Sequence, residues 1–319
     1  MSKAMKIFVT GANGFVGKHL VAELSQRGHE VFAGIRPGAW TVPSPVKACH
    51  YDILNRKALY ELLKKIKPDG IIHLASQSKV AESWKDPAAT FSVNAIGTIH
   101  LIQAAAQSVP QAKIITAGSS EEYGLAGKSV QPLTEEDACY PQNPYAASKL
   151  AMGQVALQLA RKHDLNLIHV RAFNHFGPGQ REGFVISDFA SQIARIENKG
   201  APAFIRVGDL RIARDFTDVR DVVRAYSLLL EKEVNPGVYN ICSGAARTLH
   251  DILEDLLRMA DVLIQIQIDK ERFRPAEVLT FLGSPRKINE AIQWKPEIPF
   301  HKSLLDTLQF WRMQIRQGN

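Results

Sequence analysis

The sequence predicts an α/β protein: a doubly wound parallel sheet followed by a smaller α/β domain. Three observations lead to this prediction. Short apolar runs alternate with amphipathic stretches through the first half of the chain, which is typical of a parallel sheet covered by helices on both faces. A glycine-rich turn directly follows the first apolar run. After about Phe173, strands shorten and turn-rich segments such as 177–179 and 198–202 separate them.

Apolar spacing and helix-stopping residues place the individual elements. A stripe of Val16, Leu20, Val21 and Leu24 predicts the first helix, which ends at Gly28. Pro68 ends the next helix, since proline cannot continue one. The predicted strands are 7–10, 31–35, a third that ends before residue 52, 70–74, 113–117, 166–171 and 237–241. The remaining predicted helices are 56–67, 90–107, 144–163 and 218–230, the last packed on the sheet.

The composition excludes several classes of protein. With 45% hydrophobic residues among 319, the chain has enough apolar surface for a core, which excludes a disordered chain. No apolar run reaches the roughly 18 residues that span a bilayer, and the first residues do not resemble a signal peptide. Cys49, Cys139 and Cys242 lie far apart, which predicts free thiols, a cytoplasmic location and no metal site.

The charge balance predicts neither a nucleic-acid nor a membrane partner. The formal charge is +7, from 39 basic and 32 acidic residues, but no block of five Lys or Arg residues occurs. The arginines are scattered instead, which suits discrete phosphates on a small molecule.

The turn after the first strand has the spacing of a Rossmann dinucleotide site. Gly11 permits the tight turn, Gly14 lets the backbone approach a pyrophosphate, and Gly17 allows close packing of helix on strand. The helix that begins here offers unpaired N–H groups and a positive dipole to the phosphates. The predicted cofactor contacts of this turn are Gly11, Asn13, Gly14, Phe15, Val16 and Gly17.

The end of the second strand indicates which dinucleotide binds. An NAD site places a carboxylate there, but no acidic residue occurs between Val31 and Tyr51, and Arg36 follows the strand. Because a guanidinium pairs with a 2′-phosphate, we predict NADP, with NADPH preferred over NADH but NADH also used. Asp52 and Ile53 are placed to meet the adenine; a helix N-cap is the alternative interpretation of Asp52.

Tyr145 and Lys149 are four residues apart, so they lie on one face of the helix 144–163. A pair at this spacing is expected about once by chance, but this one follows a strand that ends in Ser119. Ligands of such sheets bind at the carboxyl ends of strands. A nearby cation is expected to lower the pKa of the tyrosine, and a serine hydroxyl can then hold the substrate oxygen.

Five motifs in order resemble the extended short-chain dehydrogenases/reductases that act on nucleotide sugars. They are Thr10–Gly17, His73–Ser76, Asn94 with Gly97 and Thr98, Ser119–Gly124, and Tyr145–Lys149. The resemblance implies a catalytic triad of Ser119, Tyr145 and Lys149. It also implies a homodimer formed through a four-helix contact. Further cofactor contacts that it implies are Leu74, Ala75, Ser76, Asn94, Tyr145 and Lys149.

The second half of the chain resembles the GDP-4-keto-6-deoxy-mannose reductases, through the segments 171–180, 183–189, 214–219 and 274–278. This resemblance implies NADPH-dependent reduction of a C4 keto group to form GDP-D-rhamnose. Residues 1–173, completed by about 216–243, then bind NADP, and 174–319 mainly bind the nucleotide sugar. The implied substrate contacts are Ser119, Ser120, Glu121, Asn174, Val185, Arg214, Arg274 and Glu277. Arg214 and Arg274 can clamp a diphosphate; alternatively, Arg214 pairs with Asp218 and Arg274 with Glu277.

Other functions stay open at this point. Glu121 occupies the position of the base in related 4,6-dehydratases and could abstract a sugar C5 proton, so a dehydratase or a bifunctional enzyme is an alternative. A nucleotide-sugar epimerase is another. A non-catalytic NADP-binding protein would be expected to lack Tyr145 or Lys149, and both are present.

Overall fold

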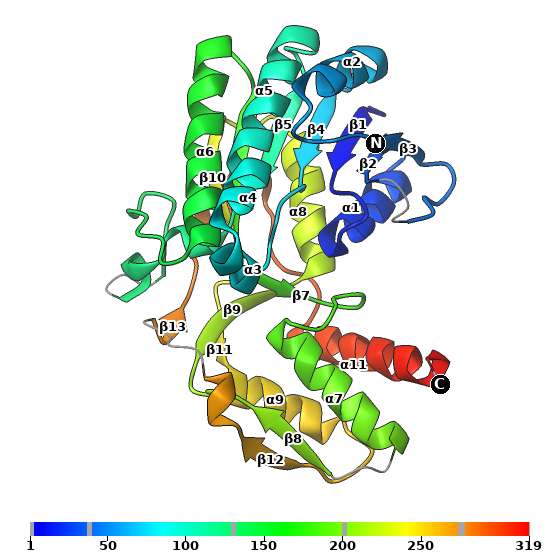
Figure 1. The fold of residues 1–319 in the computed structure, drawn as a ribbon, viewed down its shortest axis with the longest axis vertical. Helices are drawn as coiled ribbons and strands as arrows, with labels where there is room; N and C mark the ends of the chain where they lie inside the picture. Colours follow the sequence, from blue (N-terminus) through cyan, green and yellow to red (C-terminus); the bar gives the residue numbers. More distant parts are fainter. Residues whose placement is uncertain (1–2, 37–39, 129–131, 200–202, 274–277, 319) are drawn as a thin grey trace.

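The computed structural model describes residues 3–36, 40–128, 132–199, 203–273 and 278–318. Its larger lobe is built on a seven-stranded parallel sheet (Figure 1). The strands, in spatial order, are β10 (Gly237–Ile241), β6 (Leu167–Ala172), β5 (Lys113–Ala117), β4 (Gly70–His73), β1 (Lys6–Thr10), β2 (Glu30–Ile35) and β3 (Lys47–His50). The order reverses beside β1, so the ends of β1 and β4 form the crevice in which such sheets bind ligands. The predicted Rossmann fold class is confirmed.

Helices cover both faces of this sheet. On one face α1 (Phe15–Gln26) packs against α8 (Val219–Glu231), and on the other α2 (Arg56–Ile66), α5 (Gly97–Ser108) and α6 (Pro144–His163) lie side by side (Figure 1). Leu20 and Val222 belong to the core of the first face, Leu59 and Leu101 to that of the second. The predicted apolar stripe of the first helix is therefore the face that it buries.

The expected helix 90–107 is the main correction to the predicted elements. The chain forms α3 (Val80–Lys85), then α4 (Pro87–Phe91), a π-helical turn at Ser92–Ile96, and α5. Asp86 caps α4, which starts early because proline suits the first helical turn. The π-helical turn carries Asn94, whose side chain is hydrogen-bonded outside the helix, and such turns often mark functional sites.

The smaller lobe follows β6 and contains shorter strands. β9 (Ala213–Asp218) pairs with β7 (Asn174–Phe176), β11 (Ala246–Thr248) and β13 (Thr280–Phe281), and β8 (Phe204–Val207) pairs with β12 (Gln265–Ile268). The helices of this lobe and its connections are α7 (Val185–Lys199), α9 (Leu249–Arg258), α10 (Arg286–Ile292) and α11 (Phe300–Gln317). α7, α9 and α11 share one core that includes Phe189, Leu253 and Leu304. The boundary at residue 173 stays a prediction.

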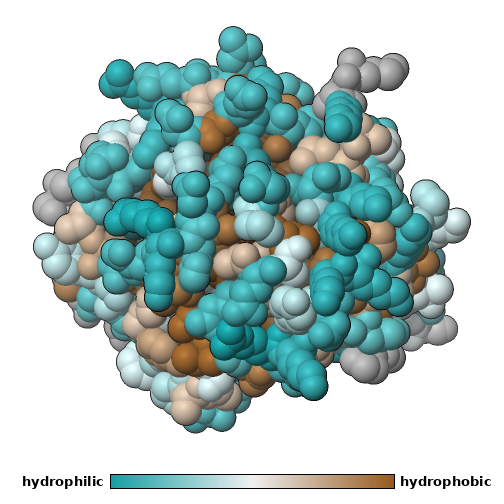
Figure 2. Space-filling view, turned by 90° about the horizontal axis from the view of Figure 1, so that it is seen from above, coloured by the Kyte–Doolittle hydropathy of each residue, from teal (hydrophilic) through white to brown (hydrophobic). Residues whose placement is uncertain are grey.

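The surface of the molecule is mostly polar in the view from above, with apolar residues recessed between hydrophilic ones (Figure 2). Within the described residues, no helix has the length and apolar character needed to cross a membrane.

Candidate active site

The glycine turn forms a tight cradle at the end of β1. Gly11 has φ +66°, and a Cβ there would lie 2.8 Å from the amide nitrogen of Ala75. A Cβ on Gly17 would overlap the carbonyl oxygen of Gly11. α1 begins after Gly14 with no side-chain cap and no acidic residue in its first turn. Its free N–H groups therefore fit a pyrophosphate, and the cradle fits the backbone approach of a dinucleotide.

Two residues with no predicted role, Tyr51 and His73, support this cradle. The Tyr51 hydroxyl accepts a hydrogen bond of 3.2 Å from the N–H of Gly11, and burial raises the pKa of Tyr51 to about 12. His73 is hydrogen-bonded to Thr10 on one side (2.7 Å) and to Thr98 on the other (2.9 Å). Burial lowers the pKa of His73 to about 3, so the ring is neutral. The motif His73–Ser76 contains this residue, but no local pattern predicts its two hydroxyl partners.

The segment Leu74–Ala75–Ser76 passes directly in front of Gly11. The Ala75 N–H donates to the Thr10 hydroxyl at 3.1 Å, and the Leu74 N–H to the Thr10 carbonyl at 3.3 Å. The Asn94 side chain accepts from the N–H of Gln77 at 2.8 Å and donates to the Ser148 hydroxyl at 2.9 Å. Asn94 thus ties this segment to α6, the helix of Tyr145 and Lys149.

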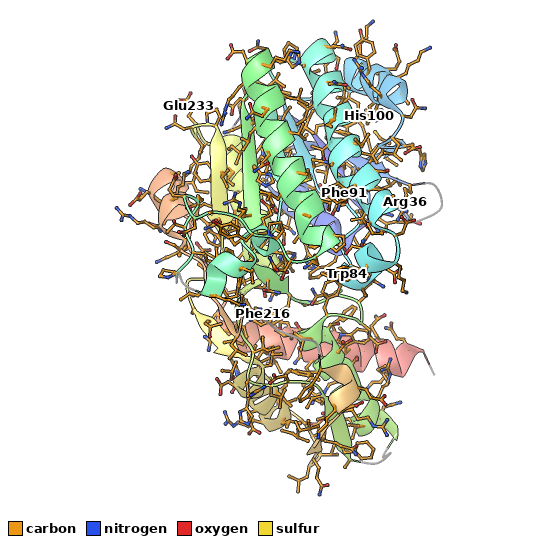
Figure 3. All side chains as sticks on the ribbon, turned by 60° about the vertical axis from the view of Figure 1, so that its left-hand side comes forward. Arg36, Trp84, Phe91, His100, Phe216 and Glu233 are labelled. Atoms are coloured by element: carbon orange, nitrogen blue, oxygen red, sulfur yellow. The ribbon has the colours of Figure 1, made fainter. Side chains whose placement is uncertain are left out.

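Arg36 lies at the margin of the larger lobe, directly after β2 (Figure 3). Its side chain is exposed and makes no ion pair within the described part of the chain, so it is free to meet a phosphate. The N-cap interpretation of Asp52 is wrong: Asn55 caps α2 through the N–H of Ala58, and Asp52 accepts instead from the N–H of Leu54 at 2.9 Å. Asp52 is exposed and Ile53 is buried beside Gly97.

Ser119, Tyr145 and Lys149 are brought together at the carboxyl end of β5. Ser119 follows this strand by two residues, and its side chain is near enough to the Tyr145 hydroxyl to act on the pKa of that group. The Lys149 ammonium lies 5.9 Å from the centre of the Tyr145 ring and donates to the Ala117 carbonyl at 2.8 Å. The three polar groups therefore meet beside the dinucleotide cradle.

The expected lowering of the Tyr145 pKa by Lys149 is not what this structure shows. Burial raises the pKa of the Tyr145 hydroxyl, the Ser119 side chain opposes that rise, and the charges of Glu121 and Glu122 add to it. Lys149 donates to a backbone carbonyl instead. Burial lowers the pKa of Lys149 to about 8, with Glu122 acting in the opposite direction.

The expected substrate residues come from both lobes. Ser120 is buried, and Glu121 accepts a hydrogen bond of 3.4 Å from the Asn143 side chain. Arg214 donates to the carbonyls of Ala213 and Leu279, and the charge of Glu121 acts on its pKa. Asn174 is exposed. Val185, half-buried, begins α7.

Arg214 and Arg274 are the two arginines expected to bind the diphosphate of the substrate. The alternative pairing of Arg214 with Asp218 is wrong, because the Asp218 carboxylate accepts two hydrogen bonds from the Arg220 side chain, at 3.0 and 2.7 Å. Arg274 and Glu277 lie outside the described residues. Within the described residues, no cluster of three or more His, Cys, Asp or Glu side chains could hold a metal ion.

A parallel sheet with a dinucleotide cradle beside a Ser–Tyr–Lys constellation defines a dinucleotide-dependent oxidoreductase. Residues 8–307 match the family model described as GDP-mannose 4,6 dehydratase. The chain belongs to this family, which lies within the extended short-chain dehydrogenases/reductases.

Individual relatives cover almost the whole chain. The GDP-6-deoxy-D-mannose reductase of Pseudomonas aeruginosa is 38% identical over 98% of this chain and 99% of its own length. GDP-mannose 4,6 dehydratase 1 of Arabidopsis thaliana is 30% identical over 92% of this chain and 86% of its own length. Among solved structures, RMD from Pseudomonas aeruginosa complexed with NADPH has a TM-score of 0.85 at 36% identity and covers 98% of this chain and 100% of that one.

Proposed function

We propose that this protein reduces the C4 keto group of GDP-4-keto-6-deoxy-D-mannose with NADPH, forming GDP-D-rhamnose. The observation that carries the proposal is the meeting of Ser119, Tyr145 and Lys149 at the end of β5, beside the glycine cradle. Support comes from the 38% identity to a GDP-6-deoxy-D-mannose reductase, against 30% or less to the dehydratases.

Each residue of the triad has a separate task. When bound, NADPH supplies a hydride to C4. The Tyr145 hydroxyl donates its proton to the C4 oxygen, while the Ser119 hydroxyl orients that oxygen. Lys149, held by the Ala117 carbonyl, presents its ammonium to the nicotinamide ribose, close to the Tyr145 ring.

Charge and position suggest how the rest of the substrate and cofactor are held. Gly11, Gly14 and Gly17 would hold the pyrophosphate of NADPH, and Arg36 its 2′-phosphate. Arg214 is poorly compensated: burial lowers its pKa, and its described hydrogen-bond partners are carbonyls. A substrate diphosphate would supply the missing negative charge. We assign Arg274, Glu277, Asn174 and Val185 to the same nucleotide sugar.

The test is oxidation of NADPH by the purified protein with GDP-4-keto-6-deoxy-D-mannose and, separately, with GDP-mannose. We expect consumption of NADPH and formation of GDP-D-rhamnose with the keto sugar alone. Tightly retained cofactor with no net consumption would indicate an epimerase instead.

Glu121 favours a second candidate, a GDP-mannose 4,6-dehydratase or a bifunctional enzyme. Its carboxylate follows Ser119 by two residues and is partly exposed. It is held by Asn143, the residue that caps the helix of Tyr145. A carboxylate so placed can abstract a sugar proton.

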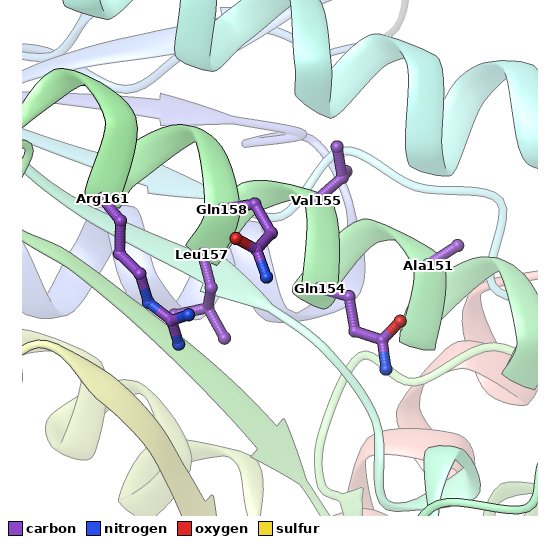
Figure 4. A pocket seen from close by; sticks show the side chains of 6 residues that line it. All are labelled: Ala151, Gln154, Val155, Leu157, Gln158 and Arg161. Carbon is purple, nitrogen blue, oxygen red and sulfur yellow. The ribbon is translucent and has the colours of Figure 1, made fainter.

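We further propose that the protein is a cytoplasmic homodimer in which a second copy covers α5 and α6. α6 has a shallow depression lined by Ala151, Gln154, Val155, Leu157, Gln158 and Arg161 (Figure 4). On the neighbouring segment Phe91 and Ile96 are 36% and 44% exposed, and Figure 3 shows Phe91 and His100 on the same side of the molecule. Adjacent apolar side chains on two helices suit a helix-to-helix interface.

A further inference from the structure

Glu122 is a carboxylate buried directly behind the proposed catalytic serine. None of its side chain is exposed. Its Oε1 accepts a hydrogen bond of 2.8 Å from the N–H of Ser119, and its Oε2 one of 3.1 Å from Nε of Arg171. Nε2 of His169 lies 3.2 and 3.3 Å from the two oxygens. Since Nε2 faces only acceptors here, it is the donor.

Two glycines leave the space that this carboxylate and imidazole occupy. A Cβ on Gly118, directly after β5, would overlap both Oε1 of Glu122 and Nε2 of His169. A Cβ on Gly153, one turn beyond Lys149 on α6, would overlap the His169 ring. Thr116 holds the other ring nitrogen at 2.9 Å. The loop after β5 and the helix α6 therefore both carry a glycine where a larger residue would collide with Glu122 or His169.

Stability alone is a weak reason for a buried charge at this position. Removing a carboxylate from water costs several kcal/mol, and buried ion pairs often stabilise no more than well-packed apolar side chains of similar volume. Glu122 touches the backbone of Ser119, and its charge acts on the pKa values of both Lys149 and Tyr145. The carboxylate is thus connected to all three residues of the proposed triad.

We propose that Glu122 is a positioning residue of this reductase: it fixes Ser119 through the backbone N–H and keeps a negative charge behind Lys149. The proposal rests on the function proposed above. Its first consequence is geometric, because the Ser119 hydroxyl can orient a substrate oxygen only if the Ser119 backbone is held. Its second is electrostatic, because a buried ammonium is retained more readily near a buried carboxylate.

The electrostatic consequence sets the direction of a pH effect. Among the described residues, five titratable or charged groups interact with the charge of Glu122. They are His169 and Arg171 on β6, Tyr145 and Lys149 on α6, and Cys139 in the loop before α6. Glu121 is the adjacent residue. Glu122 raises the pKa of Lys149, against the stronger effect of burial. Removing the carboxylate should therefore lower the pH at which Lys149 loses its proton, and with it the alkaline limit of activity.

The test compares three variants with the wild-type protein. Glu122→Gln keeps the shape and removes the charge, Glu122→Asp keeps the charge and withdraws it from Ser119, and His169→Gln removes the imidazole but leaves the carboxylate. Thermal unfolding and NADPH binding by fluorescence show whether each variant is folded and takes up cofactor. We expect kcat to fall by about tenfold or more in both Glu122 variants, with NADPH affinity within about threefold of the wild type.

The pH profile of kcat/KM separates positioning from a structural role. We expect the alkaline limb to move to lower pH by about half a unit or more in Glu122→Gln and to stay in place in Glu122→Asp and His169→Gln. Wild-type kcat and profile in a folded Glu122→Gln would overturn the proposal, as would equal shifts in Glu122→Gln and His169→Gln. If Glu122→Gln does not fold, wild-type kcat in Glu122→Asp would overturn it. An inactive wild-type protein would instead overturn the reductase function.

Discussion

The Nζ of Lys149 donates a hydrogen bond of 2.8 Å to the carbonyl of Ala117, the last residue of β5. This contact ties the second turn of α6 to the strand that leads into Ser119. It helps to explain how Tyr145 on the helix and Ser119 in the loop, 26 positions earlier, can act on one substrate oxygen. It also holds the ammonium close to the Tyr145 ring, although burial still raises the pKa of that hydroxyl.

Replacing the proton donor should nearly abolish the reaction. Tyr145→Phe removes the hydroxyl and leaves the packing of the ring, so we expect kcat to fall by about 100-fold or more. Tyr60→Phe, on α2, is the matched control and should retain wild-type turnover. Steady-state oxidation of NADPH with the keto sugar is the measurement. A Tyr145→Phe protein with near wild-type kcat would assign proton donation to another group.

Glu121 should not abstract a proton if the protein is a reductase. GDP-mannose incubated with the protein and catalytic NADP in deuterated water should then give no 4-keto-6-deoxy product. Mass spectrometry of the recovered sugar should find no deuterium at C5 or C6. Incorporation that disappears in Glu121→Gln would instead show that the carboxylate is a dehydratase base.

His73 makes stability depend on pH. Burial takes its pKa from 6.5 to about 3. Between these values the unfolded chain binds a proton that the folded one does not. The free energy of unfolding therefore falls as the pH drops through this window, by at most about 1.4 kcal/mol per pH unit from this residue.

Urea unfolding of His73→Asn between pH 7 and pH 4 tests this dependence. We expect the slope of stability against pH to be smaller than in the wild type, although the half-buried His19 and His175, whose pKa values are also lowered, keep it above zero. His250→Asn, at an exposed site, should leave the slope unchanged. Parallel curves for His73→Asn and the wild type would mean that His73 is protonated in the folded chain.

The sequence predicted the sheet and most helices because their signals are local. The bounds Pro144–His163 and Gly237–Ile241 match the expected elements, since Asn143 caps the first and glycine starts the second. It did not predict α3 or the π-helical turn, and the π-helical turn carries Asn94, whose hydrogen bonds reach Gln77 and Ser148 across the fold.

Local motifs also identified the triad, whereas the groups behind it were missed. Tyr51, His73 and Glu122 contact Gly11, Thr10 and Ser119 from 40, 63 and 3 residues away. No spacing rule marks a hydroxyl that meets a distant backbone N–H. Ser119 and Glu122 do have the spacing of a capping box, but nothing local marks the partners of Glu122 on β6. Only the folded arrangement of β3, β4 and β6 brings these groups together.

The proposed dimer can be broken from the middle of α6. Val155→Arg places a charge in the depression of that helix, and burying it between two copies would be costly. We expect sedimentation to show a monomer for this variant and a dimer for the wild type. Ile268→Arg, at an apolar residue 52% exposed on the smaller lobe, is the control and should stay dimeric. A dimeric Val155→Arg would place the interface elsewhere.

Arg36 should decide the choice of coenzyme. It stands where an NAD site has a carboxylate, so nothing there repels a 2′-phosphate and one cation attracts it. A partly solvated contact between arginine and phosphate contributes about 1.5–3 kcal/mol, which corresponds to a preference of roughly 10- to 150-fold for NADPH over NADH. Arg36→Ala should remove most of this preference. Arg36→Asp should reverse it, because repulsion then replaces attraction.

The ratio of kcat/KM for the two coenzymes measures the effect, with the keto sugar at a saturating concentration. Lys162→Asp makes the same change in net charge at an exposed position in the last turn of α6. It should leave the ratio unchanged, because solvent screens exposed charges beyond about 10 Å. The control separates a local contact from the general field of a basic protein. Equal use of both coenzymes by the wild type, unchanged in Arg36→Ala, would mean that Arg36 faces only solvent and that the 2′-phosphate is held elsewhere.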